Sequence, residues 1–304
     1  MNESPNAARF ALRRCPGRLR GHGLASLRHL RGRPMSFSAP PRRAGFVERP
    51  DCRIAYEVTG SGPALVFAHG LGGNLMSWWQ QVAHFAPHRT CVAFSHRGFF
   101  PSTAPAGGPD PAAYAEDLAA LVDHLGLGDI SIVCQSMGGW TGVEYALLRP
   151  HRVKALVLAA TVGSLDPNLV PGAMSTKQEG AAAALLARNM HPASGARMAE
   201  EQPALHHLYH HIFGLTQGFD REAVRAKLYA LRTRKAAELA ATGCPVLFVP
   251  SEEDVVLPYS GEAMAAAIPG AHAATIRRAG HSGHFERAAE FNALVERFLD
   301  DVGG

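Results

Sequence analysis

The chain has 304 residues, of which 47% are hydrophobic and 18% are charged, and its formal net charge is +4. This length suits one large α/β domain with an insertion, and the composition is ordinary for a soluble globular protein. No apolar run approaches the roughly 18 residues that a membrane-spanning helix needs. We therefore expect no membrane segment and no membrane partner.

The positive charge is concentrated at the N-terminus. Residues 1–43 contain ten arginines and a single acid, Glu3, whereas the rest of the chain holds 20 basic and 25 acidic residues. A body with a net charge of −5 gives no reason to expect nucleic acid as a partner. We expect residues 1–43 to be a disordered basic arm outside the function, although their composition is similar to that of a mitochondrial transit peptide. Met35 is an alternative start, so it stays open whether residues 1–34 belong to the mature protein.

The five cysteines are an odd number and lack the spacing of a metal site. They are Cys15, Cys52, Cys91, Cys134 and Cys244. The last three fall in or beside predicted buried strands, which favours reduced thiols in a cytoplasmic protein.

From residue 45 the chain predicts strands first and then an alternation of helices and strands. Short apolar runs predict strands at 46–48, 53–58, 64–68, 90–94, 129–134, 153–160, 245–250 and 273–277. Apolar residues at helical spacing predict helices near 76–86, 111–125, 137–149, 258–268 and 284–300. Asp110 and Pro111 form a start signal for the second of these helices. The alternation indicates a mostly parallel sheet with helices on both faces, and a site at the carboxyl ends of its strands.

Residues 165–242 interrupt this alternation, because they carry helical patterns and no convincing strand. The segment includes an alanine-rich stretch near 177–189, a histidine-rich stretch near 197–213, and a long helix that follows Asp220 and stays in phase as far as Leu239. We interpret it as a helical insertion over the sheet. The predicted domains are the arm at 1–43, a core at 44–164 and 243–304, and a helical cap at 165–242.

The most informative motif is C-Q-S-M-G-G at residues 134–139, which directly follows the predicted strand. A strand that turns at once into a helix lifts the hydroxyl of Ser136 out of the sheet. Such a nucleophile elbow normally reads G-x-S-x-G, with the serine strained and the helix passing close to the strand. Gly138 supplies the downstream small residue, but Cys134 replaces the upstream glycine. Ser136 is the predicted nucleophile, and it needs a base, an acid and an oxyanion hole.

A glycine-rich turn, H-G-L-G-G at residues 69–73, ends another predicted strand about 65 residues before the serine. Such a turn lets a backbone N–H face the nucleophile. We expect the amides of Leu71 and Met137 to stabilise a developing oxyanion, with help from the dipole of the helix that begins at Met137. A plain tight turn is the alternative reading.

Carboxylates follow the predicted strand at 245–250. A carboxylate at the carboxyl end of a strand can accept a hydrogen bond from a base histidine and stabilise its cation. Asp254 is the predicted acid because it lies at the turn before the next helix. Glu252 and Glu253 are expected to be solvated, and Asp166 is a minor alternative.

The predicted base is His281, one of 16 histidines. It lies in a loop after the last predicted strand, 27 residues beyond Asp254, where an imidazole can reach both acid and nucleophile. His284 is the rival, but it falls at the start of the final helix.

The order Ser136, Asp254, His281 resembles that of the α/β-hydrolase superfamily. The motifs H-G-L-G-G, Q-S-M-G-G, S-E-E-D and A-G-H-S-G-H-F-E-R are similar to those of its small cofactor-free members. The resemblance covers residues 44–304 and implies an eight-stranded sheet, a helical cap, a Ser136–Asp254–His281 triad, an oxyanion hole at Leu71 and Met137, and no cofactor or metal. Around the arginine loop the family pattern is D-x-R-G-x-G-x-S, whereas this chain has Ser95 and Phe100. These departures bear on loop shape and not on the triad.

The resemblance leaves the reaction open. A serine nucleophile favours hydrolysis of a small carboxylic ester or lactone through an acyl-enzyme, with a small molecule as the only expected partner. Carbon–carbon bond hydrolases of ring-fission products share S-M-G-G but usually have tryptophan just after the base, where this chain has Ser282-Gly283. Enol-lactone hydrolases look most similar in motif spacing. A third hypothesis is a non-catalytic binding module on the same fold. The sequence leaves open whether the protein forms a homodimer.

The histidines of the predicted cap offer a possible metal site. H-H-L-Y-H-H places His206 with His210 and His207 with His211 at i,i+4 spacing, which can bind zinc, but a polar helix face is the plainer interpretation.

Aromatic residues flank the glycine-rich turn and the elbow. Trp78, Trp79 and Trp140 are candidates for a pocket wall or for buried packing. We expect Trp140 and His69 to line the substrate pocket.

Overall fold

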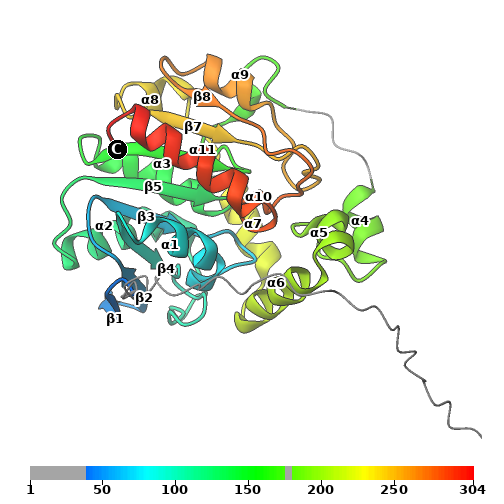
Figure 1. The fold of residues 1–304 in the computed structure, drawn as a ribbon, viewed down its shortest axis with the longest axis horizontal. Helices are drawn as coiled ribbons and strands as arrows, with labels where there is room; N and C mark the ends of the chain where they lie inside the picture. Colours follow the sequence, from blue (N-terminus) through cyan, green and yellow to red (C-terminus); the bar gives the residue numbers. More distant parts are fainter. Residues whose placement is uncertain (1–38, 175–179) are drawn as a thin grey trace, which may run out of the picture. The chain divides into compact units, whose positions relative to one another are not determined.

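Eight strands form one mixed sheet in the computed structural model, which describes residues 39–174 and 180–304 (Figure 1). The strands are β1 (Arg42–Glu48), β2 (Arg53–Thr59), β3 (Ala64–Ala68), β4 (Thr90–Phe94), β5 (Ile130–Gln135), β6 (Val153–Ala159), β7 (Val246–Val249) and β8 (His272–Ala273). Their order in the sheet is β1-β2-β4-β3-β5-β6-β7-β8. β1 pairs with β2, and β2 with β4, in antiparallel fashion, and every other pairing is parallel. This is the fold class that the sequence predicts.

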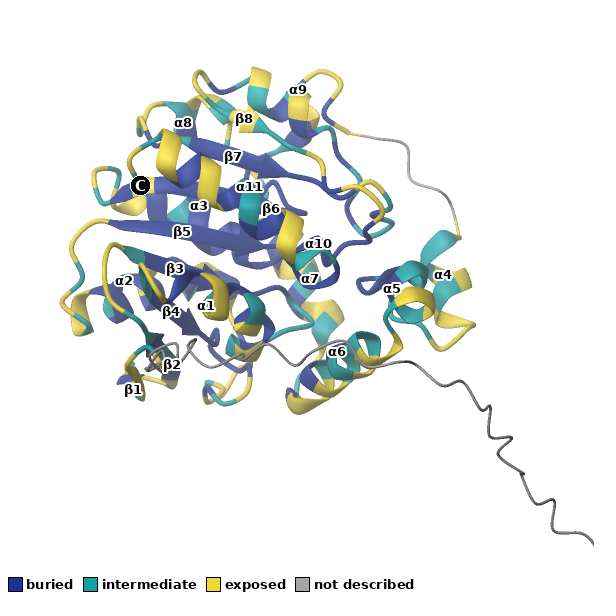
Figure 2. Ribbon diagram, in the orientation of Figure 1, coloured by how far each residue is buried: buried dark blue, intermediate teal, exposed yellow. Residues whose placement is uncertain are grey.

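Helices cover both faces of the sheet. α1 (Trp79–Phe85) and α11 (Ala288–Asp301) share one core cluster with Leu65 and Phe67 of β3. Val66 and Ala68 point the other way, because side chains alternate along a strand, and pack with the opposite helices. Those helices are α2 (Tyr114–His124), α3 (Gly138–Leu148), α8 (Ala236–Ala240) and α9 (Gly261–Ala266). The central strands are therefore buried on both faces (Figure 2).

The segment between β6 and β7 is helical. It contains η3 (Pro167–Leu169), α4 (Ala181–Leu186), α5 (Gly195–Glu201), α6 (Pro203–Leu215), α7 (Arg221–Ala230) and α8. α4 to α7 lie beside the sheet and show much exposed surface (Figures 1 and 2). Asp220 caps α7 by accepting from two backbone amides, as its place in the sequence predicts.

The remaining helices are short. They are η1 (Leu75–Trp78), η2 (Pro111–Ala113) and α10 (Gly283–Glu286). Among the described residues no helix is long and apolar enough to cross a membrane.

Several element boundaries differ from the prediction. β1 begins at Arg42, four residues early, and the last strand has only two residues, His272–Ala273, instead of 273–277. The predicted long helix ends at Ala230, and Leu239 lies on the separate helix α8, where it is fully buried against the core. The predicted arm is outside the described residues up to residue 38.

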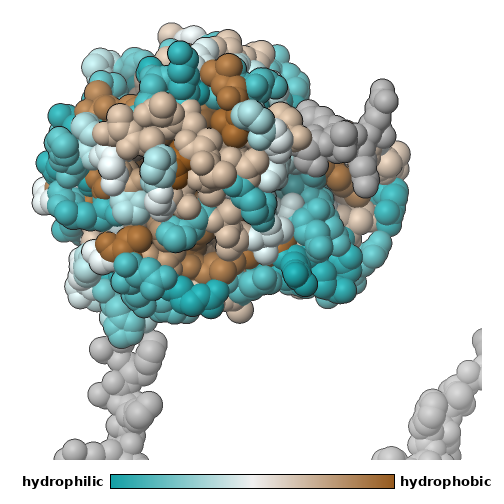
Figure 3. All heavy atoms as spheres, turned by 90° about the horizontal axis from the view of Figure 1, so that it is seen from above, coloured by the Kyte–Doolittle hydropathy of each residue, from teal (hydrophilic) through white to brown (hydrophobic). Residues whose placement is uncertain are grey.

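Hydrophobic side chains reach the surface in several separate places, as the face in Figure 3 shows. Four of the five cysteines lie within the described residues, and Cys52, Cys91, Cys134 and Cys244 are all buried free thiols.

Candidate active site

Ser136 lies in a sharp turn between β5, which ends at Gln135, and α3, which begins at Gly138. Its φ of +48° is in the left-handed region, which a residue with a side chain rarely adopts. The following helix passes very close to β3, since a Cβ added at Gly138 would lie 2.1 Å from the backbone oxygen of Ala68. This is the strained turn that the elbow motif predicts.

The thiol of Cys134 is accommodated by a glycine on the next helix. Cys134 is fully buried, and a Cβ added at Gly142 of α3 would lie only 2.4 Å from its Sγ. The larger side chain at the upstream position of the elbow is therefore matched by a residue without a side chain about one turn along α3. Burial raises the pKa of the Cys134 thiol well above its ordinary value, so the thiol is protonated and unreactive.

The structure brings Ser136, His281 and Asp254 into one hydrogen-bonded chain. Ser136 Oγ lies 2.8 Å from Nε2 of His281, and Nδ1 of the same ring lies 2.7 Å from Oδ2 of Asp254. The carboxylate accepts the Nδ1 proton, which leaves Nε2 free to accept the serine proton. His281 is 3% exposed, so the pair lies largely out of water.

Asp254 is held by its own loop. Its other oxygen, Oδ1, accepts from the backbone amides of Val256 and Leu257 at 2.7 and 3.0 Å. Both carboxylate oxygens are thus used, one to fix the loop and one to orient the imidazole. The alternative acid Asp166 instead caps η3 through the amide of Asn168.

The rival histidine, His284, is not the imidazole that lies between Ser136 and Asp254. It is buried beneath Trp78, with the ring centroids 4.6 Å apart. Burial lowers the pKa of His284 to about 3, so it is neutral.

The glycine-rich turn holds its shape through His69. Nδ1 of His69 donates to the oxygen of Gly70 at 2.8 Å, and its Nε2 accepts from the amide of His96 at 3.0 Å. His69 is fully buried and is not among the described residues that line the cavity, contrary to the prediction, because its ring nitrogens bond to Gly70 and to the loop of His96. Among the described residues no acceptor takes the amide of Leu71 or that of Met137.

A cavity of about 960 Å³ opens at Ser136. Leu71, Met137 and His281 line it, and α4, α6 and α7 close it from the other side. Trp140 lines this cavity, whereas Trp78 is fully buried and Trp79 is exposed.

The departures in the arginine loop have local partners. Ser95 accepts from the amide of Leu75 and donates to the oxygen of Phe100, so it ties this loop to η1. The amide of Phe100 donates to Thr216, which joins the loop to the segment after α6. Both departures from the family pattern thus affect contacts of this loop, and neither Ser95 nor Phe100 is among the described residues that line the cavity at Ser136.

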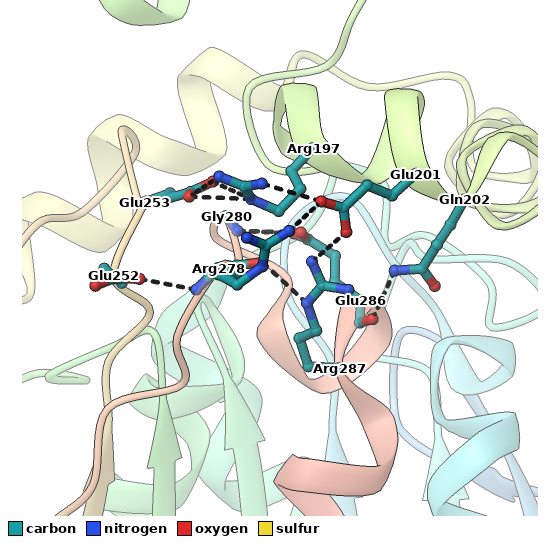
Figure 4. Close-up of polar contacts among 9 residues, drawn as sticks. All are labelled: Arg197, Glu201, Gln202, Glu252, Glu253, Arg278, Gly280, Glu286 and Arg287. Carbon is teal, nitrogen blue, oxygen red and sulfur yellow. Dashed lines mark hydrogen bonds and ion pairs between the residues drawn. The ribbon is translucent and has the colours of Figure 1, made fainter.

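A network of ion pairs joins α5 to the loops that carry Asp254 and His281 (Figure 4). Glu201 accepts from Arg197, Arg278 and Arg287. Arg197 also binds Glu253, the neighbour of Asp254, through Nε and Nη2. Sequence reasoning missed this network, because it expected Glu253 to be solvated.

Glu286 holds the loop that carries His281. Both of its carboxyl oxygens lie within 3.1 Å of the amide of Gly280, the residue before His281, and its backbone oxygen accepts from Gln202 (Figure 4). Burial raises the pKa of Glu286 to about 8, although the Gly280 amide opposes the shift. Gln135 adds a second support by donating to the backbone oxygen of His281 at 3.1 Å.

The histidine-rich helix α6 forms two imidazole pairs. Nε2 of His206 lies 3.2 Å from that of His210, and Nε2 of His207 lies 2.9 Å from that of His211. The described part of the chain contains no group of three or more His, Cys, Asp or Glu side chains that could hold a metal ion. Nothing in this geometry adds a third ligand to either pair.

Comparison with known proteins identifies the family. Residues 63–288 match the family model described as alpha/beta hydrolase fold. The chain belongs to the α/β-hydrolase fold family. A curated relative, an uncharacterized protein of Mycobacterium tuberculosis, is 28% identical over 287 residues, which cover 88% of this chain and 84% of that protein.

Two solved structures are similar to this α/β-hydrolase. A thermophilic esterase from Thermogutta terrifontis is 25% identical with a TM-score of 0.69, covering 86% of this chain and 99% of that one. The enol-lactonase from Burkholderia xenovorans LB400 is 27% identical with a TM-score of 0.65, covering 82% and 97%. The chain thus has the fold of small-molecule hydrolases over most of its length.

Proposed function

We propose that this α/β-hydrolase cleaves a small carboxylic ester or lactone through an acyl-enzyme on Ser136. One observation carries the proposal: a single imidazole, that of His281, lies 2.8 Å from the Ser136 hydroxyl and 2.7 Å from the Asp254 carboxylate. A serine becomes a useful nucleophile when a positioned base takes its proton as it attacks.

Each side chain has a defined role in the proposed reaction. Ser136 Oγ attacks the acyl carbon while its proton passes to Nε2 of His281, and Asp254 stabilises the imidazolium that forms. The carbonyl oxygen becomes an oxyanion and accepts from the amides of Leu71 and Met137. His281 then gives the proton to the departing alkoxide as its bond to the acyl carbon breaks. Water, deprotonated by the same imidazole, releases the acid and restores Ser136.

The choice of ester or lactone draws support from the similar proteins. One is named an esterase and another an enol-lactonase. The cavity also suits a small molecule, since its 960 Å³ lie within the usual range of ligand pockets. Ser282 follows the base, so the tryptophan common in carbon–carbon bond hydrolases is missing from this chain.

A series of p-nitrophenyl esters and lactones of graded acyl size tests the proposal. Ser136→Ala should lower kcat by about 10⁴-fold or more and abolish labelling by a fluorophosphonate, with the melting temperature unchanged. Wild-type turnover and labelling that persist in Ser136→Ala would refute the assignment.

The acid has a matched control in the chain. Asp254→Asn should lower kcat by about 10⁴-fold, because the amide favours the wrong imidazole tautomer. Asp166→Asn changes a carboxylate that caps η3 and should retain most of the activity. Equal losses in the two variants would contradict the proposed triad.

A further inference from the structure

The cavity beside Ser136 is lined by more positive than negative charge. Of the described residues that line it, three are arginines, Arg221, Arg225 and Arg232, and one is a carboxylate, Glu222. His191, which also lines it, has its pKa lowered to about 4 by burial, with further lowering by His210, His281, Arg221 and Arg225. The cavity therefore favours a negatively charged ligand.

Two of the three arginines are already occupied. Arg225 binds both carboxylate oxygens of Glu222. Arg221 donates through Nη2 to the backbone oxygens of Phe213 and Thr216, so it anchors the turn between α6 and α7. Neither guanidinium can therefore bind a carboxylate through two parallel N–H donors.

Arg232 differs, since its side chain has no hydrogen-bond or ion-pair partner among the described residues. Its Nε and Nη2 are buried and without an acceptor. Burial lowers the pKa of Arg232, and the phenol of Tyr229 and the carboxylate of Asp166 only partly offset this. A buried guanidinium without an anion is costly, and an anion that arrives with the substrate removes that cost.

The guanidinium is also held in place. Its central carbon lies 4.9 Å from the ring centroid of Trp140 and 4.7 Å from that of Tyr229. Trp140 is in turn fixed, because its indole N–H donates to the backbone oxygen of Leu228 at 2.9 Å. A stacked guanidinium keeps the donors at its edge in a fixed plane, which is the geometry that binds a carboxylate.

The guanidinium and the nucleophile share one cavity, because Ser136, Trp140 and Arg232 all line it. Trp140 lies in the first turn of α3, the helix that follows Ser136. An anion at Arg232 would thus occupy the cavity into which the Ser136 hydroxyl opens.

We propose that Arg232 binds a carboxylate carried by the substrate, so that the preferred ester or lactone is that of a dicarboxylic acid or a similarly charged molecule. This inference rests on the proposed function, because it names the class of substrate for the same site. Trp140 and Tyr229 form the walls of the subsite, and Arg232 supplies its charge.

Two esters of similar length test the subsite, p-nitrophenyl hydrogen glutarate and p-nitrophenyl hexanoate. Wild-type protein should prefer the glutarate, and Arg232→Gln should lower the ratio of the two kcat/KM values by about 10- to 100-fold, through the KM of the glutarate. The ratio cancels any general damage to the fold. Arg225→Gln is the matched control, since it changes a cavity arginine that is already paired, and it should keep the preference. A ratio that Arg232→Gln leaves within threefold of wild type would overturn the proposal.

A binding measurement separates this proposal from the proposed function. Calorimetry with the Ser136→Ala protein should detect glutarate, and Arg232→Gln in the same background should weaken that binding by at least tenfold. If wild type cleaves neither ester and Ser136 is not labelled, the hydrolase proposal fails, and the glutarate titration still decides the subsite. No glutarate binding, or tighter binding of inorganic phosphate, would overturn the carboxylate assignment.

Discussion

The contact between Cys134 and Gly142 makes a quantitative prediction. In Gly142→Ala the new Cβ would lie 2.4 Å from Sγ of Cys134 and 2.8 Å from Cδ1 of Leu156, both in the closely packed layer between α3 and the sheet. Overpacking of this kind costs about 1–3 kcal/mol. Alanine in a helix gains at most about 1 kcal/mol over glycine. With the full helix gain subtracted, we expect a net loss of up to about 2 kcal/mol in the free energy of unfolding.

Removing the thiol should partly rescue the variant, because only the contact with Leu156 then remains too close. Cβ of Cys134 would lie 3.7 Å from the new methyl group, an ordinary contact, so Cys134→Ala relieves the clash without a second defect at that point. In the double variant the two changes should therefore be non-additive by about 1 kcal/mol or more, as expected for residues in contact.

Urea unfolding of the wild type, both single variants and the double variant measures this coupling. Gly214→Ala is the control, because Gly214 also lies in a helix, α6, but nothing is within 4 Å of its added Cβ. It should be neutral or slightly stabilising. Additive losses within 0.5 kcal/mol in the cycle would refute the compensation between Cys134 and Gly142.

Three further predictions concern charged residues. The folded-state pKa of Glu286 is about 8, which is above its ordinary value of 4.5. The protonated carboxyl therefore contributes its full stability below pH 4.5, and this contribution is lost as the pH rises to 8. Glu286→Gln should reduce the slope of the unfolding free energy against pH in this window by at most about 1.4 kcal/mol per pH unit. Asp117→Asn should lower the free energy of unfolding by about 3 kcal/mol in urea titrations, because the buried Arg97 then keeps only the more exposed Asp51 as a carboxylate partner and Arg49 loses the carboxylate that it binds. Glu201→Gln should lower kcat/KM modestly at low salt, and the difference from wild type should vanish near 1 M salt, since the lost ion pairs are exposed; a difference that persists at high salt would contradict this role.

The sequence predicted the fold and the placement of Ser136, Asp254 and His281 for the same reason. Ser136 and Asp254 follow the buried strands β5 and β7, and His281 follows the short edge strand β8. Parallel strands bring their carboxyl ends to one edge of the sheet. Sequence motifs at the ends of the strands are therefore enough to predict which side chains meet at this edge.

Contacts between distant elements could not be predicted in this way. The match of Gly142 to Cys134 depends on how α3 is rotated over the sheet, which apolar periodicity does not resolve. Arg197 and Glu253 are 56 residues apart, and each alone reads as an ordinary surface charge. The sequence did not single out Arg232. Its buried Nε and Nη2 have no acceptor among the described residues, and this is visible only in the structure.

The chain order of the hydrogen-bonded triad has a consequence for synthesis. His281 follows Ser136 by 145 residues, and the whole segment from α4 to α7 lies between them. At about 5–20 residues per second, a ribosome makes the imidazole roughly 7–30 s after the serine. A nascent chain therefore holds an unactivated hydroxyl until the helices that enclose the cavity have been made. On the proposed mechanism, the protein cannot react with cellular esters before it can select among them.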